Sequence, residues 1–239
     1  MYNEYIRIKG TIILLTEDIA DIKKPPIEYI LLCCCSCKRP LMLKNALLSI
    51  NELKFPENIR IELLVVDNDE YRSAEGIVKK LEPDIKCPVH YAEESRRGLA
   101  FARNKVLDEA VRLGASHIML FDDDELFDKD CLIQHVDLYN SNPKAMIVSG
   151  LQLNTFSPDC PEYISNSIVF KLKTSRKKGK VKSSCATNNV FFPVSLVKDH
   201  NFYSYPHVML SPLFLPETFN FRFIVAVPPQ FSENFSFKE

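Results

Sequence analysis

The sequence lacks three features that would each point to a particular class of protein. It has no excess of charge, since 30 Lys and Arg balance 31 Asp and Glu for a net charge of −1. This balance argues against a dedicated nucleic-acid binder, in which a basic excess is usual. No apolar run approaches the ~18 residues that span a bilayer. The start, Met1 to Arg7, has no basic segment followed by an apolar one, so we expect a cytoplasmic protein without a signal peptide.

The patterns of zinc sites are also missing. Cys34 and Cys37 form a single C-x-x-C pair, which is typical of a redox pair or of half a zinc site. No second pair lies at finger-like spacing, and a structural zinc takes four ligands. We therefore interpret Cys33–Cys35 as small apolar residues of a strand. The five histidines share no spacing, which favours structural or surface roles for them.

The most informative stretch present is an apolar run that stops at four acids. Ile118 to Phe121 is followed by Asp122-Asp-Asp-Glu125. A short apolar run with polar ends is typical of a buried strand. Carboxylates crowded at its end repel one another unless a cation lies between them, and a hard divalent cation with oxygen ligands fits best. A metal-free helix-capping loop is the alternative, but Asp128 is already placed to cap the next helix.

Predicted strands alternate with predicted helices over most of the chain. The apolar patterns predict strands at Tyr29–Cys35, Ile61–Val66, Val89–Tyr91, His117–Phe121, Ala145–Ser149 and Asn189–Phe192, with a further one within Tyr5–Leu15. Helices are predicted from Pro40, after an N-cap at Ser73, over Leu99–Leu113 with Gly114 ending the helix, and after a cap at Asp128. This alternation predicts an α/β fold with a mostly parallel, Rossmann-like sheet flanked by helices.

Polar segments follow three of these strands. They are Ser36–Arg39, Asp67–Asp69 and Asp122–Asp124. In parallel α/β sheets, ligands bind outside the carboxyl ends of the strands. We therefore expect the three segments to converge on one rim of the sheet and to form a single binding site.

Four blocks of the sequence resemble motifs of the family 2 inverting glycosyltransferases, which have the GT-A nucleotide-sugar-binding fold. The blocks resemble a T-Y-x-R-P loop, a V-V-D-(D/N) loop, an E-x-x-R-G-L-x-x-A-R-N block and a D-x-D metal block, and they are Cys33–Pro40, Leu64–Asp69, Glu94–Asn104 and Phe121–Glu125. Ala186–Phe192 is a weaker fifth block that resembles the T-G-N-V strand. The resemblance implies a lead-in (1–27), a GT-A core (28–150), a partial acceptor-side region (151–198) and a tail (199–239).

The resemblance also implies a nucleotide-diphospho-sugar donor and a Mg²⁺ or Mn²⁺ ion. Asp124 would ligate the metal, and Asp122 would face the ribose or assist the metal. Asp123 would point the other way, because side chains alternate along extended chain. The implied donor-binding set is Ser36, Arg39, Pro40, Asp67, Asp69, Gly98, Arg103, Asn104, Asp122 and Asp123.

The implied reaction transfers the sugar, with inversion, to a hydroxyl of a glycan or lipid acceptor during cell-envelope polysaccharide synthesis. It has no nucleic-acid partner, and peripheral association with the inner face of the membrane is a further expectation. Inversion needs a carboxylate base, which in the family is an Asp in an acidic, Gly-containing block after the T-G-N-V strand. No such block follows Asn189 here. Among the later acids, Glu217 is the candidate base, and the others are Asp199, Glu233 and Glu239.

The tail leaves two interpretations open. Residues 199–239 hold eight of the sixteen Phe, five of the fifteen Pro and none of the six Gly. Either the tail has diverged and supplies another base, or it is out of frame from near Asp199 and the truncated enzyme binds donor only. We favour the second, since the tail lacks local consistency. A third hypothesis is another D-x-D metal-dependent phosphoryl-processing enzyme, against which the blocks around Asp67 and Arg103 argue.

Overall fold

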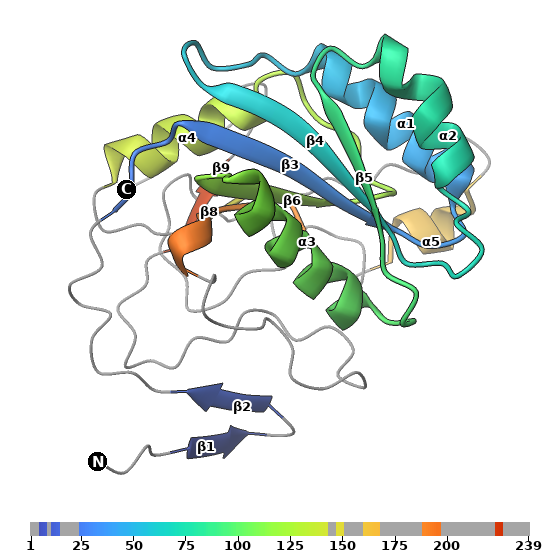
Figure 1. The fold of residues 1–239 in the computed structure, drawn as a ribbon, viewed down its shortest axis with the longest axis horizontal. Coiled ribbons are helices and arrows are strands. Elements are labelled where there is room, and N and C mark those ends of the chain that lie inside the picture. Colours follow the sequence, from blue (N-terminus) through green and yellow to red (C-terminus); the bar gives the residue numbers. More distant parts are fainter. Residues whose placement is uncertain are drawn as a thin grey trace.

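A seven-stranded sheet forms the centre of the molecule (Figure 1). The computed structural model describes residues 5–8, 11–14, 24–142, 147–150, 160–167, 188–196 and 223–226. The order of strands in the sheet is β5-β4-β3-β6-β8-β7-β9. Their bounds are β3 Tyr29–Ser36, β4 Arg60–Asp67, β5 Val89–Glu93, β6 His117–Asp122, β7 Ile147–Gly150, β8 Val190–Pro193 and β9 Phe223–Ala226. A separate antiparallel pair, β1 Tyr5–Ile8 and β2 Thr11–Leu14, replaces the one extra strand expected there.

The predicted mostly parallel sheet is confirmed. β3 pairs in parallel with β4 and with β6, and β4 pairs in parallel with β5. β8 lies antiparallel between β6 and β7, and β7 pairs in parallel with β9. The sheet therefore continues beyond residue 150, because β8 is hydrogen-bonded inside it. Four residues of the tail, Phe223–Ala226, form its last strand.

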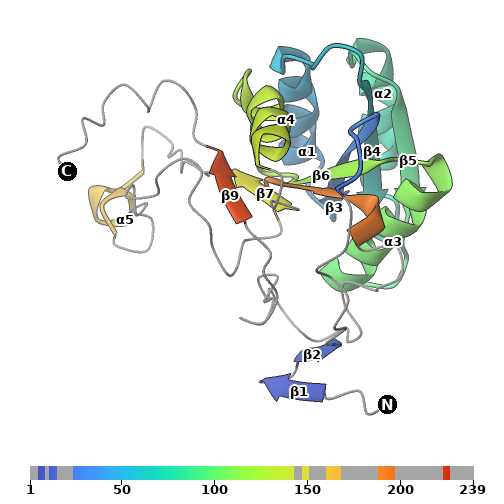
Figure 2. The same cartoon turned by 90° about the vertical axis from the view of Figure 1, so that its left-hand side faces the viewer.

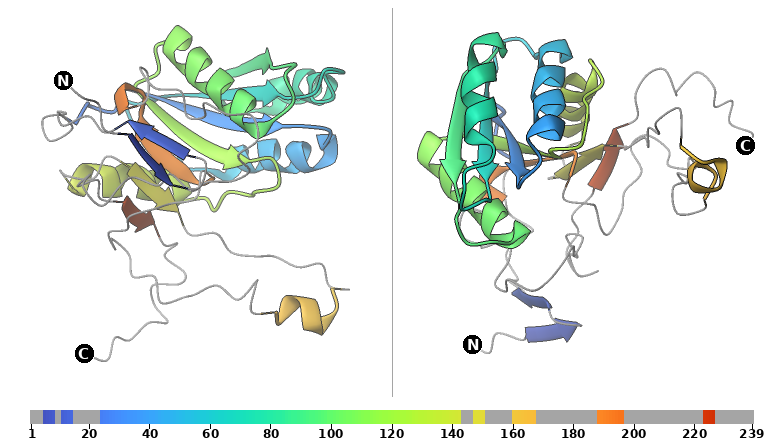
Figure 3. Two further views of the ribbon diagram at one scale, coloured as in Figure 1. Left: turned by 90° about the horizontal axis from the view of Figure 1, so that it is seen from below. Right: turned by 90° about the vertical axis from the view of Figure 1, so that its right-hand side faces the viewer.

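Helices cover both faces of the sheet (Figures 2 and 3). One face carries α1, α2 and α4, and the other carries α3. The helix bounds are α1 Pro40–Ser49, α2 Glu75–Leu81, α3 Leu99–Leu113, α4 Cys131–Ser141 and the short α5 Glu162–Ser165, with 3-10 turns η2 Ile50–Glu52, η3 Glu82–Asp84 and η4 Val194–Leu196. In the described part of the chain, no helix combines the length and the apolar character that crossing a bilayer requires.

Strand β3 lies inside the sheet, between β4 and β6, and its side chains are apolar on both faces. Leu32 and Cys34 face the core under α1, whereas Leu31 and Cys33 face the core under α3. Strands buried on both faces read as continuous apolar runs, which is what Tyr29–Cys35 shows. Cys33 and Cys34 are free, buried thiols, as the strand interpretation expects.

The predicted helix boundaries at Pro40 and Gly114 are confirmed, whereas the two predicted N-cap residues are wrong. Pro40 is the first residue of α1, and Gly114 ends α3 with a φ of 73°. Ser73 is not the N-cap of α2: Ala74 holds that position, and Ser73 Oγ accepts a hydrogen bond from the Lys38 N–H. Asp128 is not the N-cap of α4 either, since its Oδ1 accepts from the Asp130 N–H within the preceding turn.

Candidate functional site

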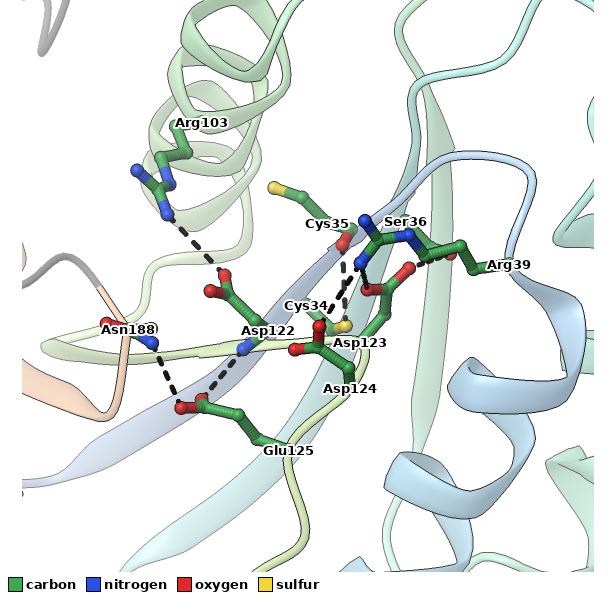
Figure 4. A network of polar contacts seen from close by, with 10 residues as sticks. All are labelled: Cys34, Cys35, Ser36, Arg39, Arg103, Asp122, Asp123, Asp124, Glu125 and Asn188. Atoms are coloured by element: carbon green, nitrogen blue, oxygen red, sulfur yellow. Dashed lines mark hydrogen bonds and ion pairs between the residues drawn. The ribbon is translucent and has the colours of Figure 1, made fainter. Parts of the chain in front are cut away.

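The three polar segments predicted to converge do meet at one rim of the sheet. The parallel register places Ser36 of β3 opposite Asp67 of β4. On the other side of β3, Cys35 lies opposite Asp122 of β6. Because all three strands run in the same direction, their carboxyl ends, with the loops that follow them, form a single polar rim. Figure 4 shows the side chains at the ends of β3 and β6, with Arg103 of α3 beside them.

The loop after β3 is tied to the acids after β6. Ser36 Oγ donates a hydrogen bond to Asp123 Oδ2 at 2.7 Å. Arg39 Nη1 lies 3.3 Å from Asp123 Oδ1 and 3.2 Å from Asp124 Oδ2. The Asp123 side chain is only 7% exposed, whereas that of Asp124 is 51% exposed. Asp123 is thus held inside the rim, while Asp124 presents its carboxylate to the outside.

Asp122 points to a different neighbour. Its Oδ1 lies 3.5 Å from Nη2 of Arg103 on helix α3, and the Arg103 side chain is 4% exposed. In Figure 4, Asp122 faces α3 while Asp123 faces the loop of Ser36 and Arg39. The predicted alternation of Asp122 and Asp123 therefore matches their geometry, and it connects the acidic segment to both neighbouring elements.

Burial opposes negative charge in this segment. It is the main reason that the pKa of Asp122 is raised, and Asp124 and Asp123 add to the rise while Arg103 opposes it. Burial likewise raises the pKa of Asp123, against hydrogen bonding from Ser36 and the charge of Arg39. A further positive charge would stabilise the ionised carboxylates.

Asp67 organises the loop that follows β4. It is fully buried, and its carboxylate accepts hydrogen bonds from the Ala74 N–H at 2.7 Å, the Tyr91 hydroxyl at 3.0 Å and the Asp69 N–H at 3.2 Å. Burial raises the pKa of Asp67 despite these bonds. Asp69 is buried as well and lies 3.7 Å from Lys38 Nζ. Contacts of Asp67 and Asp69 with a nucleotide stay a prediction.

Asn68 is a positioning residue that the sequence analysis missed. Its Nδ2 donates to the backbone oxygens of Glu94 and Arg96, both at 2.8 Å, and its Oδ1 accepts from the Gly98 N–H at 2.9 Å. Gly98 has a φ of 142°, a conformation that L-residues avoid. Asn68 and Gly98 together fix the start of α3 and hence the position of Arg103. In the sequence, the only indication of this role was the position of the Asn68 amide between Asp67 and Asp69.

Glu125 has a similar bridging role. Its Oε2 accepts from the Asp122 N–H and its Oε1 accepts from Asn188 Nδ2, each at 3.0 Å. Asn188 belongs to the Ala186–Phe192 block and lies two residues before β8. Glu125 therefore joins the end of β6 to the start of β8. The remaining predicted donor residues are Pro40, at the start of α1, and Asn104, which follows Arg103 on α3.

The acids at the end of β6 fit a divalent cation that shares its coordination with a ligand. The described residues contain no group of three or more His, Cys, Asp or Glu side chains arranged to hold a metal. Mg²⁺ sites commonly use only one or two carboxylates together with substrate phosphates. Asp124, which is half-exposed, and Asp122, which is 38% exposed, provide two such hard oxygen donors. The predicted base Glu217 lies outside the described residues.

The sheet and its polar rim define an α/β protein with a ligand site at the strand ends. Residues 29–200, more than half of the chain, match the sequence model of the family described as Glycosyl transferase family 2. The chain belongs to this family, as the four blocks implied.

Individual relatives are distant. The succinoglycan biosynthesis protein ExoM of Rhizobium meliloti (strain 1021) is 23% identical over 154 residues, which are 64% of this chain and 48% of ExoM. This chain thus spans about half the length of that curated relative. The crystal structure of S. aureus TarS 1-349 is similar with a TM-score of 0.59 at 14% identity, covering 82% of this chain and 57% of TarS 1-349. The same protein in complex with UDP-GlcNAc has a TM-score of 0.51 at 14% identity, over 72% of this chain and 47% of the other. These likenesses confirm the GT-A fold.

Proposed function

We propose that this chain binds a nucleotide-diphospho-sugar donor at the polar rim and transfers its sugar to a hydroxyl acceptor. The observation that carries the proposal is the convergence of Ser36–Arg39, Asp67–Asp69 and Asp122–Asp124 on one rim in a family 2 chain. That a similar protein, TarS 1-349, was solved in complex with UDP-GlcNAc supports a nucleotide-sugar as the ligand.

A divalent metal belongs to the proposal. When bound, Mg²⁺ or Mn²⁺ neutralises the charge of the diphosphate leaving group. Asp124 and Asp122 would hold it, since both carboxylates are partly exposed at the end of β6. Arg103 orients Asp122 from α3, and Ser36 keeps Asp123 inside the rim. Arg39 adds a guanidinium whose planar fork suits phosphate oxygens.

For the acceptor, we propose a chemical class only. Of the two proposed acceptors, a glycan or a lipid, the name of the relative ExoM, a succinoglycan biosynthesis protein, supports a glycan. Transfer with inversion needs a carboxylate within hydrogen-bond reach of the acceptor hydroxyl. The proposal also places this sugar transfer at the inner face of the membrane and includes no nucleic-acid partner.

Metal-dependent nucleotide binding provides the test. Calorimetry with UDP and with GDP, each with and without Mn²⁺, should show binding that requires the metal. Asp124→Asn should weaken this binding by about tenfold or more, because it removes a charged ligand of the cation. The matched control is Asp137→Asn, the same loss of charge at an exposed position of α4. Equal binding by the wild type, with and without Mn²⁺, and by Asp124→Asn would overturn the proposal.

A second candidate function is donor binding without sugar transfer. It is favoured by one sequence observation: no acidic, Gly-containing block follows Asn189, and the last 41 residues contain no Gly. Incubation with UDP- and GDP-sugars, followed by chromatography of released nucleotide and sugar, separates the two candidates. Turnover that is lost in Glu217→Gln would identify the base and exclude the binding-only candidate. Donor binding without turnover, together with a G-E-D-like block in another reading frame after codon 199, would establish it.

A further inference from the structure

We infer that Arg39 is an internal counter-cation of the acidic segment, which a divalent cation at Asp124 displaces so that the freed guanidinium binds the donor diphosphate. The inference rests on the proposed function, because it concerns how the same site is loaded. It assigns Arg39 two positions: one across the acids, and one on the phosphates of the donor.

The position across the acids is visible in Figure 4. A single nitrogen, Arg39 Nη1, lies 3.3 Å from Asp123 Oδ1 and 3.2 Å from Asp124 Oδ2. It therefore bridges the buried and the exposed acid of the segment. Eighty-four and eighty-five residues separate Arg39 from these partners, so the bridge is a tertiary contact between two loops.

The bridge holds the carboxylate that a metal needs. Asp124 is the most exposed of the three consecutive aspartates and thus the most accessible to an ion from solvent. A guanidinium and a divalent cation on one carboxylate repel each other strongly at contact distance. The two cations therefore compete for Asp124, and the ion that binds it must move the guanidinium away.

The loop allows this movement without refolding. Arg39 is 53% exposed, so its side chain can rotate into solvent. The backbone beside it is anchored, because the Lys38 N–H donates to Ser73 Oγ at 3.0 Å and Pro40 begins α1. Asp123 keeps its hydrogen bond from Ser36 Oγ at 2.7 Å when Arg39 leaves. Only one long side chain has to change position.

The exchange links the metal to the donor. While Arg39 bridges Asp123 and Asp124, the metal alone binds weakly, and Nη1 of the guanidinium contacts the acids instead of phosphate. Binding of either ligand removes part of this obstacle for the other, and such coupling is reciprocal. The metal and the nucleoside diphosphate are therefore expected to load together.

The test measures Mn²⁺ binding by the loss of the free-ion EPR signal, without nucleotide and then with saturating UDP or GDP. Arg39→Gln is expected to bind Mn²⁺ about fivefold more tightly than the wild type in the absence of nucleotide, which is the size of effect that a partly exposed ion pair supports. The same variant should bind the diphosphate more weakly when Mn²⁺ is present, because a phosphate ligand is gone.

The matched control is Lys38→Gln. It removes the same charge from the neighbouring residue, whose Nζ lies near Asp69 rather than near the β6 acids. A general increase in negative potential would tighten Mn²⁺ binding equally in both variants, and that result would overturn the exchange. An unchanged Mn²⁺ affinity in Arg39→Gln would overturn it as well, while metal-dependent nucleotide binding by the wild type would leave the proposed function intact. Failure of the wild type to bind Mn²⁺ even with nucleotide would overturn both.

Discussion

Asp123 is the residue in which the conflict between burial and charge is sharpest. It is 5% exposed, and its carboxylate accepts hydrogen bonds from Ser36 and Arg39. These contacts favour the ionised form, yet burial outweighs them and raises the pKa of Asp123 above its ordinary value of 3.8.

The raised pKa predicts how Asp123→Asn changes stability with pH. A carboxyl group whose pKa is raised on folding stabilises the protein most at pH values below its unfolded pKa, and this contribution is lost as the pH rises through the folded value. The wild type should therefore lose stability relative to Asp123→Asn as the pH rises from 3.8 towards neutrality. Thermal melts of both proteins across that range measure the difference. A difference that stays constant, or that shifts in favour of the wild type, would contradict the raised pKa.

For single residues, the sequence identified the acids at the end of β6 but not the side chains that contact them. The D-x-D pattern is local, so Asp122 and Asp124 were found from the sequence. Arg39 bridges Asp123 and Asp124 across more than eighty residues, and no local pattern encodes that contact. Ser73 was likewise misassigned: Ala74 is the N-cap of α2, and the Ser73 hydroxyl accepts from the distant Lys38 N–H.

Among the elements, the entry to α3 is the most constrained. Asn68 holds the Glu94–Gly98 loop with three hydrogen bonds, and Gly98 has a φ of 142°. The helix that follows brings Arg103 to Asp122. The G-L-x-x-A-R-N block therefore has a mechanical reason for its glycine: the turn before α3 requires a conformation that a Cβ disfavours.

Gly98→Ala and Gly76→Ala form a matched pair of substitutions, because Gly98 has a positive φ whereas Gly76 lies in a regular helix. Gly98→Ala should cost about 1–3 kcal/mol in the free energy of unfolding, because alanine is strained at this φ. Gly76→Ala should be neutral or stabilise by about 0.5 kcal/mol, since Gly76 lies in α2 with open space around its missing Cβ. Urea denaturation followed by circular dichroism measures both. Equal effects of the two substitutions would show that the turn before α3 tolerates a side chain.

For the whole molecule, the decisive feature is that β8 inserts between β6 and β7. Phe191 of β8 is fully buried, with its ring stacked on His117 at 5.1 Å between centroids and edge-on to Tyr139 at 5.4 Å. The strand from the far side of residue 150 therefore shares a core with β6 and α4. This packing joins β8 and the part of the chain before residue 150 into one hydrophobic unit.

Phe191→Ala should accordingly destabilise the whole unit. We expect a loss of about 3–5 kcal/mol in the free energy of unfolding, as for large aromatic side chains in cores. The control Tyr163→Ala removes an aromatic ring that is 78% exposed and should change stability little. The chain has no Trp, so circular dichroism is the suitable probe. If Phe191→Ala left the main unfolding transition unchanged, β8 would be an accessory strand instead of part of the core.

The sequence by itself determined strands β3 to β8, most helix boundaries and the membership of the acidic rim, but not β9 or the pairing of β1 with β2. These follow from local physics: apolar runs buried on both faces, helical spacing, and prolines and glycines at helix ends, as at Pro40 and Gly114. Only the tertiary structure decided which carboxylate is buried, which is exposed and which cation lies between them. Those properties depend on strand register and on contacts between loops far apart in the chain. Burial is the main reason that the pKa values of Asp122 and Asp123 are raised.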